Sequence, residues 1–256
     1  MNNTVVNPLI EIHGLEKRFG PIHAVRGISF SVSKGEVLGF LGPNGAGKST
    51  TMKMITGFLE PTAGSVAVCG FDIAEDPIEA KKRIGYLPEG APLYGEMTVF
   101  SFLNFVAEIR GMSGEYRKNR IDEVINKINL EAVRHQSLET LSKGYKRRVG
   151  VAHALLHDPE ILIMDEPTDG LDPNQKHEVR TLIQEMAQEK AIIISTHILE
   201  EVDAVCTRAI IIASGQLLFD GTPKELLEKS GTGKLDDVFR DITTRFYEEK
   251  GVTERS

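Results

Sequence analysis

The chain has 256 residues, 41% of them hydrophobic, and a formal net charge of −7 at pH 7. This size allows one large core with a smaller attached lobe, and the acidic balance disfavours a protein that grips nucleic acid, because such binding needs clustered Lys and Arg. The longest apolar runs are too short to cross a bilayer, so a membrane role is expected to require a partner; they are 161–164, 191–194 and 209–213.

Two further features bear on where the protein works. Residues 1–4 are not a basic segment followed by an apolar one, so no secretory signal is predicted and a cytoplasmic protein is expected. Cys69 and Cys206 stand beside apolar residues without zinc-site spacing, which predicts buried, reduced thiols. The basic run 146–148 is too short to form a nucleic-acid-binding stripe, and a solvated helix face explains it equally well.

The pattern of apolar residues predicts an α/β fold. Two alternating segments near the N-terminus predict antiparallel strands: Ile10, Ile12 and Leu15, then Ile28, Phe30 and Val32. Short aliphatic segments then recur with helices between them, as in a buried, mainly parallel sheet; they are 37–41, 65–68, 84–87, 161–164, 191–195 and 209–213. Apolar residues at helical spacing over 97–129 break this alternation and predict an inserted helical lobe.

The last part of the chain continues with short elements. Residues 214–216 separate two strand-like segments and predict a hairpin turn, and Thr222 with Pro223 predicts the start of a helix that runs towards Ser230. The segment after residue 230 is highly charged and is expected to be peripheral.

Residues 42–50 fit the phosphate-binding pattern G-x-x-x-x-G-K-[ST] at every position. Glycines let the backbone fold around a polyphosphate, Lys48 is expected to reach the β- and γ-phosphates, and the hydroxyl of Ser49 offers a ligand to Mg²⁺. An accidental match is the alternative, but a predicted strand before the loop and a predicted helix over 48–57 favour anion binding at a helix N-terminus. The expected nucleotide-binding residues are Gly42, Pro43, Asn44, Gly45, Ala46, Gly47, Lys48, Ser49 and Thr50, the last at the α-phosphate.

A second motif follows the strand predicted at 161–164. Asp165 and Glu166 come directly after it, so both carboxylates are expected at the C-terminal edge of the sheet, beside the phosphate loop. Asp165 is predicted to hold Mg²⁺, directly or through water, and Glu166 to polarise the attacking water. The alternative is a strand followed by an acidic turn at 167–170.

A third motif places another helix N-terminus between these two. The segment 141–145, Leu-Ser-Lys-Gly-Tyr, precedes a predicted helix. With this segment the order of motifs resembles the ATP-binding cassette family, whose signature Leu-Ser-Gly-Gly-Gln occupies the same place. The resemblance covers nearly the whole chain and includes Pro167, Leu171-Asp172 and Ser195-Thr196-His197.

The resemblance implies a fold and a domain organisation. It implies a P-loop NTPase core with a mainly parallel sheet, an N-terminal antiparallel β subdomain and an inserted helical subdomain at about 96–157. These parts are expected to form one domain over 1–230, followed by a charged C-terminal tail over 231–256.

The resemblance also implies roles for residues that are uninformative alone. The signature of one subunit is expected to close on the γ-phosphate held by the other, through Ser142, Lys143, Gly144 and Tyr145, with Asp172 in a loop at the dimer interface. His197 is expected to touch the γ-phosphate, and Lys48, Glu166 and His197 form the expected catalytic set. Phe19 matches the aromatic residue that stacks on adenine, although a core aromatic on an edge strand is the alternative.

The chain departs from the family pattern at three positions. Glu89 stands where the family carries Gln; we expect it to serve as a Mg²⁺ ligand with Ser49 and Asp165, either tightening metal binding or weakening ATP binding through repulsion. Lys143 and Tyr145 replace Gly and Gln of the signature. Lys143 is expected either to neutralise the opposed triphosphate or to be solvated.

The function implied is that of a cytoplasmic ATPase subunit at the inner face of the cell membrane. It would form a homodimer around ATP and Mg²⁺, without nucleic acid, and drive a separate membrane permease through Glu89 and the segment 92–94. The substitutions and the segment 235–239 resemble the drug, lipid, polysaccharide and gliding-motility exporter branch, although an amphipathic surface helix explains Val238 and Phe239 equally well. The alternatives are a soluble cassette ATPase that acts on another cytoplasmic complex and a regulator that binds ATP without hydrolysis.

Overall fold

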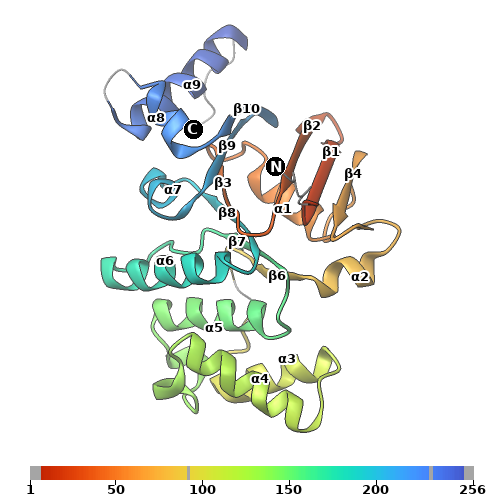
Figure 1. The fold of residues 1–256 in the computed structure, drawn as a ribbon, viewed down its shortest axis with the longest axis vertical. Helices are drawn as coiled ribbons and strands as arrows, with labels where there is room; N and C mark the ends of the chain where they lie inside the picture. Colours follow the sequence, from red (N-terminus) through yellow and green to blue (C-terminus); the bar gives the residue numbers. More distant parts are fainter. Residues whose placement is uncertain (1–6, 91–92, 231–232, 251–256) are drawn as a thin grey trace, which may run out of the picture.

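The computed structural model describes residues 7–90, 93–230 and 233–250. Their centre is a six-stranded sheet in the order β10-β9-β3-β8-β7-β6, in which every neighbouring pair is parallel except β9 and β10 (Figure 1). The strands β3, β7 and β8 are buried at every residue, as expected for strands covered on both faces. The bounds are β3 Val37–Leu41, β6 Ile84–Leu87, β7 Ile161–Asp165, β8 Ala191–Thr196, β9 Arg208–Ala213 and β10 Gln216–Gly221.

A second, antiparallel sheet has the order β2-β1-β4-β5 and confirms the predicted N-terminal strands. Its strands are β1 Ile10–Phe19, β2 Ile22–Val32, β4 Ala63–Val68 and β5 Phe71–Asp72. The prediction that 65–68 joins the parallel sheet is wrong, because β4 pairs antiparallel with β1, with Val68 opposite Ile10 and Val66 opposite Ile12. Val66 and Val68 are buried while their neighbours are less so, which is the alternation of a sheet with one covered face.

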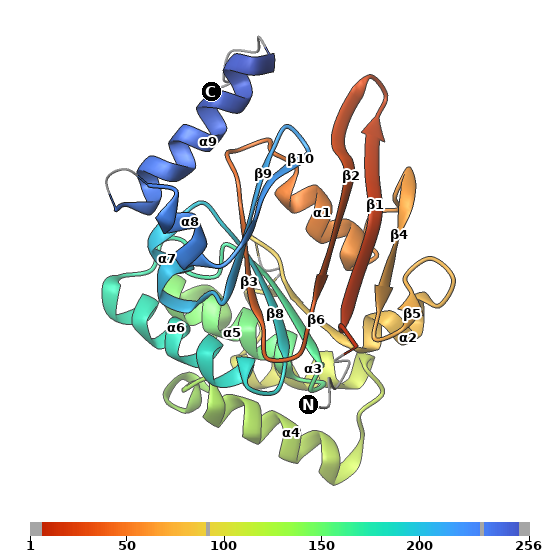
Figure 2. The ribbon, with the colours of Figure 1, turned by 45° about the horizontal axis from the view of Figure 1, so that its top comes forward.

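Two apolar cores lie on opposite faces of the six-stranded sheet. Alternation along the strands sends Leu38 and Phe40 into one core and Val37 and Leu41 into the other. The first core is shared with the antiparallel sheet and with α1 (Lys48–Ile55), which lies between the two sheets in Figure 2. The helices α6 (Pro173–Ala187) and α7 (Leu199–Val205) cover the other face, and α2 (Pro77–Lys82) precedes β6.

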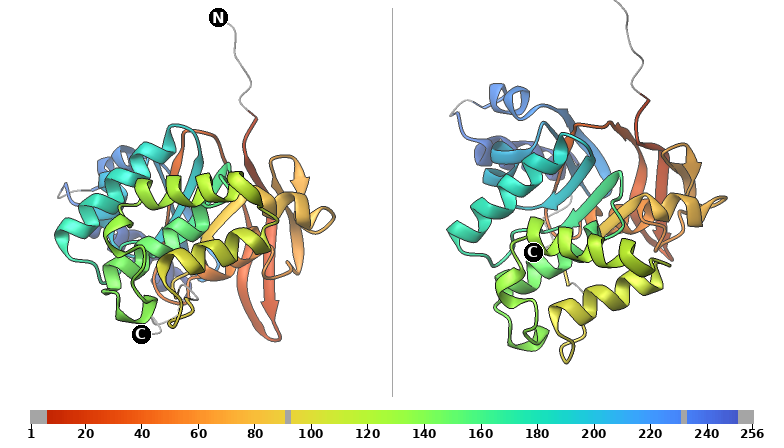
Figure 3. Two further views of the ribbon diagram at one scale, coloured as in Figure 1. Left: turned by 90° about the horizontal axis from the view of Figure 1, so that it is seen from below. Right: turned by 60° about the horizontal axis from the view of Figure 1, so that its bottom comes forward.

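The helical segment predicted over 97–129 is present as α3 (Val99–Ile109) and α4 (Gly114–Lys127). Thr98 caps α3 through a capping box with Ser101. Two short 3₁₀ turns, Glu131–Val133 and Leu138–Thr140, lead to α5 (Lys143–Leu155). In Figure 3, seen from below, these helices lie in front of the strands.

The C-terminal elements follow the predicted order. Ser214 and Gly215 form the two-residue turn between β9 and β10, both with positive φ, as such hairpins require. Thr222 caps α8 (Pro223–Glu228), and α9 spans Leu235–Lys250. Leu235 and Val238 are buried in the larger core, so α9 is anchored at its first turn.

Two remaining observations concern the membrane and the cysteines. Within residues 7–90, 93–230 and 233–250, no helix is long enough and apolar enough to cross a membrane. Cys206 is buried, as predicted, but Cys69, in the turn after β4, is only half-buried. Both thiols are free.

Candidate functional site

The phosphate loop connects β3 to α1, and its glycines are required by close packing. A Cβ atom on Gly42 would lie 2.3 Å from the Ile212 carbonyl oxygen. Gly47 has φ of 106°, and a Cβ there would lie 2.6 Å from the Ala24 carbonyl oxygen. Gly47 is the N-cap of α1 and offers no side chain to the first turn, so the helix presents its N-terminal amides to the loop.

Lys48 is folded back into this loop. Its side chain is 7% exposed and donates hydrogen bonds to the carbonyl oxygens of Gly42, at 2.6 Å, and Pro43, at 3.2 Å. Burial lowers the pKa of the ammonium group, and nearby carboxylates oppose that shift: those of Glu166, Asp165 and Glu89. Three of the predicted site carboxylates thus lie within electrostatic range of Lys48.

The acidic pair lies at the C-terminal edge of the sheet, as predicted. β7 and β8 are parallel neighbours with Asp165 opposite Ser195, so the residues that follow both strands meet. Asp165 is buried, and the backbone of Glu166 has φ of 51° with its N–H donating to the Ser195 carbonyl oxygen at 2.9 Å. His197 Nδ1 donates to Glu166 Oε1 at 2.9 Å.

Polar atoms without partners surround this pair. Within the described residues, Glu166 Oε2 and Ser195 Oγ are buried and lack a hydrogen-bond partner. Buried polar atoms are nearly always satisfied, so these two oxygens mark a place where a ligand or water completes the network. Beside Lys48 and the helix N-terminus, this arrangement suits a polyphosphate and an attacking water.

Arg147 belongs to the site although the sequence interpretation missed it. A solvated face was one interpretation of the run 146–148, and it is wrong for Arg147, which is 8% exposed. Its guanidinium group donates to five backbone carbonyl oxygens, those of Pro88, Glu89, Asp165, Glu166 and Pro167. Helical spacing could have indicated that Arg147 is buried, because it lies on the same buried face of α5 as Gly144, Val151 and Leu155.

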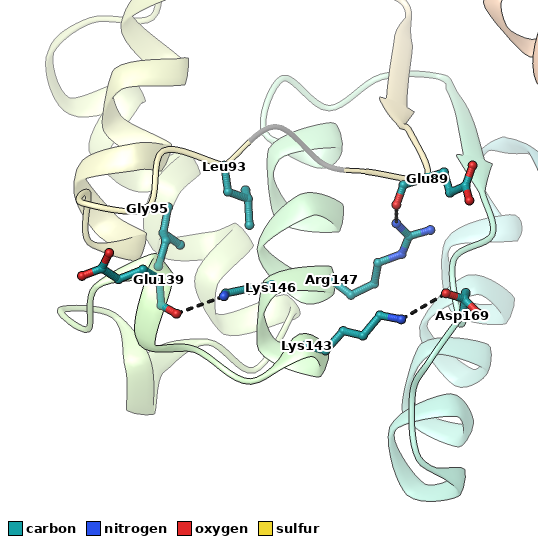
Figure 4. Close-up of a pocket in the computed structure, with 9 residues that line it drawn as sticks. Glu89, Leu93, Gly95, Glu139, Lys143, Lys146, Arg147 and Asp169 are labelled. Carbon is teal, nitrogen blue, oxygen red and sulfur yellow. Dashed lines mark hydrogen bonds and ion pairs between the residues drawn. The ribbon is translucent and has the colours of Figure 1, made fainter.

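Glu89 is one of the residues that line a cavity of about 350 Å³ between the core and the helical segment (Figure 4). Its side chain is exposed, and its backbone carbonyl is held by Arg147 at 2.9 Å. The lining of the cavity combines charged side chains with the apolar Leu93. Of the segment 92–94, Pro92 lies outside the described residues.

The signature residues make their described contacts within their own chain, and Lys143 contacts the loop after Glu166. Ser142 caps α5 and accepts a hydrogen bond from the Tyr145 amide at 3.4 Å, while Gly144 packs against Gln175. Lys143 Nζ lies 3.1 Å from Asp169 Oδ2, so Lys143 is not simply solvated (Figure 4). In the described parts of the chain, no hydrogen bond joins 142–145 to 42–50.

Two predicted residues occupy peripheral positions. Asp172 is exposed and caps α6, accepting from the Gln175 amide at 3.0 Å. Phe19, at the end of β1, is 46% exposed, with Lys17 Nζ 5.3 Å from its ring centroid. This exposure excludes the interpretation of Phe19 as a core aromatic, and it keeps part of the ring accessible from solvent.

Comparisons with known proteins agree with this geometry. A family model described as ABC transporter matches residues 25–169, more than half of the chain. The ABC transporter ATP-binding protein NatA of Bacillus subtilis (strain 168) is 39% identical over 88% of this chain and 92% of that protein. The Nod factor export ATP-binding protein I of Burkholderia orbicola (strain AU 1054) is 38% identical over 86% of this chain and 72% of that protein.

Solved structures show the same relationship. A chain described as the ATP-binding subunit of an ABC transporter superposes with a TM-score of 0.82 and 30% identity, covering 91% of this chain and 99% of that one. The cbiO1 protein of Clostridium perfringens, part of the ABC transporter complex cbiONQ, gives 0.80 and 26%, covering 96% and 99%. The α/β fold predicted from the sequence is thereby confirmed, and the chain belongs to the ABC transporter family as an ATP-binding protein that hydrolyses ATP to power transport.

Proposed function

We propose that this protein is the ATPase subunit of an exporter, in which two identical copies close around ATP and Mg²⁺ and move a separate membrane permease. The observation that carries this proposal is the Glu166–His197 hydrogen bond of 2.9 Å, formed where Glu166 also lies in the electrostatic field of Lys48. A carboxylate oriented by a histidine beside a phosphate-binding lysine suits in-line attack of water on a γ-phosphate.

Each residue at the sheet edge has a part in this reaction. Lys48 would exchange its bonds to the loop carbonyls for the β- and γ-phosphates, and the amides of 42–50 would hold the remaining phosphate oxygens. Glu166 would orient the attacking water, using its unpartnered Oε2, and His197 would contact the γ-phosphate. Phe19 would stack on adenine.

Magnesium fits the donor set at this edge. Asp165, Glu89 and Ser49 offer oxygen ligands, and both carboxylates lie close enough to act on Lys48. Among the described residues, no group of three His, Cys, Asp or Glu side chains could hold a metal unaided, which suits an ion that relies on substrate phosphates for further ligands. When held by these residues, Mg²⁺ would supply positive charge that offsets the negative charge developing during phosphoryl transfer.

The position of the signature supports a homodimer. The residues 142–145 hydrogen-bond within their own chain but not to 42–50 in the described structure, so a second copy is the natural source of a signature for each phosphate loop. A two-fold dimer would give two equivalent composite sites, with Asp172 near the interface.

A membrane partner is supported by the relatives and by the cavity beside Glu89. One relative is named for Nod factor export, another for linearmycin resistance, and one solved neighbour is part of a multi-component transporter complex. The cavity of about 350 Å³ lies between the core and the helical segment. A short helix of the permease that binds there would be moved when the dimer closes. We place the protein at the inner face of the membrane, with a single ATPase domain over 1–230 and a tail over 231–256.

The Glu166→Gln variant tests this proposal. It keeps the size of the side chain but removes the carboxylate, so we expect ATP binding to persist, turnover to be nearly abolished, and light scattering to show a dimer with ATP and a monomer with ADP. Copurification of a polytopic membrane protein with the tagged chain tests the partner. Normal hydrolysis by Glu166→Gln, or a monomer at saturating ATP with the membrane partner present, would contradict the proposal.

A further inference from the structure

Each N–H donor of the buried Arg147 guanidinium group has a carbonyl oxygen as its acceptor. Nε donates to Pro167 O at 3.1 Å, Nη1 to Pro88 O at 3.1 Å and Glu89 O at 2.9 Å, and Nη2 to the carbonyl oxygens of Asp165 and Glu166. A guanidinium group has five N–H donors, so all of them are used, and within the described residues no carboxylate forms an ion pair with this side chain.

The five acceptors lie at the C-terminal ends of two neighbouring strands and in the loops that follow them. Pro88 and Glu89 follow β6 and carry the proposed metal ligand, whereas Asp165 ends β7 and is followed by Glu166 and Pro167. Arg147 itself lies in the second turn of α5, the helix that begins at the signature. One side chain therefore joins the helical segment to both loops of the candidate site. Figure 4 shows its hydrogen bond to the Glu89 carbonyl oxygen.

The conformation of Glu166 explains why such a link is needed. Its φ of 51° lies in the left-handed region, which is unfavourable for a residue with a Cβ atom and persists only where the surroundings fix it. The Ser195 carbonyl holds the Glu166 N–H, and Arg147 holds the Glu166 carbonyl oxygen. With both ends of the residue fixed, its side chain meets His197.

The charge of Arg147 also suits this position. The carboxylates of Asp165, Asp169, Glu166 and Glu89 all favour its charged form and oppose the effect of burial, which lowers the pKa of the guanidinium group. Asp169 pairs instead with Lys143. Arg147 is thus a counter-charge for the acidic cluster while its hydrogen bonds go to the backbone.

We propose that Arg147 is a positioning residue for ATP hydrolysis, which holds Glu166 and the Glu89 loop as one unit without contacting the nucleotide. The inference rests on the proposed role of Glu166. It predicts a defect in turnover rather than in nucleotide affinity, because the loop 42–50 is not among the acceptors of Arg147.

The test compares Arg147→Lys with the matched control Arg120→Lys. Lysine keeps the charge and three donors but cannot reach five carbonyls in a plane. Arg120, on α4, likewise donates to backbone carbonyls of α5, those of Leu155 and Leu156 at the opposite end of the helix. For Arg147→Lys we expect kcat to fall about 100-fold, as for a misplaced catalytic group, and the Kd of a fluorescent ATP analogue to stay within about threefold. Arg120→Lys should keep the kcat of the wild type.

A double variant gives a readout that a purely structural role would not move. If Arg147 acts through Glu166, adding Arg147→Lys to Glu166→Gln should cause little further loss in the single-turnover rate. Independent, multiplicative losses would overturn the inference. An unchanged kcat in Arg147→Lys would also overturn the inference. So would a decrease in activity that arises mainly from weaker nucleotide binding, or one that disappears at temperatures below the melting transition of the variant. If Glu166→Gln hydrolyses normally, the proposed role of Glu166 fails; if Glu166→Gln is inactive and Arg147→Lys is active, the positioning role alone fails.

Discussion

Lys143 of the signature segment reaches Asp169 of the same chain, with Nζ 3.1 Å from Oδ2. The pair connects the N-terminus of α5 to the loop between Glu166 and α6. Gly170 makes room for it, because a Cβ there would collide with the Lys143 side chain. In an isolated subunit, the cation expected to face a partner's triphosphate is thus already bound to a carboxylate.

The first prediction concerns the strength of this pair. The side chains of Lys143 and Asp169 are 64% and 54% exposed, so their attraction is screened by solvent. Lys143→Met should lower the free energy of unfolding by less than about 1 kcal/mol. The hydrogen bond from Lys143 is the main cause that lowers the pKa of Asp169 below 3.8, so the contribution is complete above that value and is lost as the pH falls through the lower, folded-state pKa.

Urea denaturation of Lys143→Met and Asp169→Asn at pH 7 measures this contribution. Single and double variants complete a double-mutant cycle, with Lys118→Met on the exposed face of α4 as a control for loss of a surface charge. A coupling energy well above about 1 kcal/mol would show that the pair is a structural link rather than a weak surface contact.

The second prediction concerns Glu89 as a metal ligand. Its carboxylate acts on Lys48 together with Asp165, so replacing it should weaken Mg²⁺ in the nucleotide complex. Glu89→Ala should raise the Mg²⁺ concentration for half-maximal ATPase activity about tenfold, and Glu89→Gln, which keeps one oxygen, should be affected less.

Glu139→Ala is the matched control for Glu89. Glu139 lines the same cavity, and the bond it accepts from Lys146 uses its backbone carbonyl, which alanine retains. Titration of activity with MgCl₂ at fixed ATP gives the comparison. Equal Mg²⁺ dependence in Glu89→Ala and wild type would remove Glu89 from the metal site.

The third prediction concerns the packing of the phosphate loop. Gly47→Ala adds a Cβ atom at 2.6 Å from the Ala24 carbonyl oxygen and at φ of 106°, so the loop must shift. We expect ATP binding to be lost and the protein to be destabilised by about 1–3 kcal/mol. Gly70→Ala, with φ of 82° but no atom within 4 Å of the added Cβ, separates backbone strain from collision. Calorimetric ATP binding should survive in Gly70→Ala; its survival in Gly47→Ala would contradict the required geometry.

The parts that the sequence predicted are those in which each position has a local physical reason. The phosphate loop is such a case, because Gly42 and Gly47 have no space for a Cβ atom and Lys48 follows at a fixed offset. The placement of Asp165 and Glu166 at the C-terminal edge of the sheet followed from their position at the end of a buried strand, although the hydrogen bond between His197 and Glu166 was not predicted. The buried strands of the parallel sheet were found from their aliphatic runs.

The errors arose where long-range contacts decide the outcome. A short apolar run such as 65–68 does not say which strand it pairs with, and β4 joins β1 instead of the parallel sheet. Arg147 lies in a basic run, but its partners are carbonyls on two distant loops, which no local pattern encodes. The Lys143–Asp169 pair was not predicted either, because the two residues are 26 positions apart and no local pattern links them. The expected role of Lys143 toward a partner's triphosphate stays a prediction.

The last prediction is a loss of stability in mild acid, caused by two histidines on and after α5. Burial is the main cause that lowers the pKa of His157 to about 3 and that of His153 to about 4, with Arg110 adding to both shifts. His157 Nε2 donates to the Ile84 carbonyl oxygen at 3.0 Å, and its Nδ1 is buried without a partner in the described residues. Because the unfolded chain binds protons near pH 6.5 and the folded one does not, stability falls as the pH drops from 6.5 towards 4. At pH 5 each group should cost about 2 kcal/mol.

Thermal or urea unfolding between pH 7.5 and pH 5 tests this linkage. His157→Gln keeps a donor for the Ile84 carbonyl but cannot titrate, so its stability should decline less steeply with pH than that of the wild type. His13→Gln is the control for loss of a histidine at the surface, because the side chain of His13 is 71% exposed. If His157→Gln lost stability in parallel with the wild type, protonation of His157 would not be the event that destabilises the fold in acid.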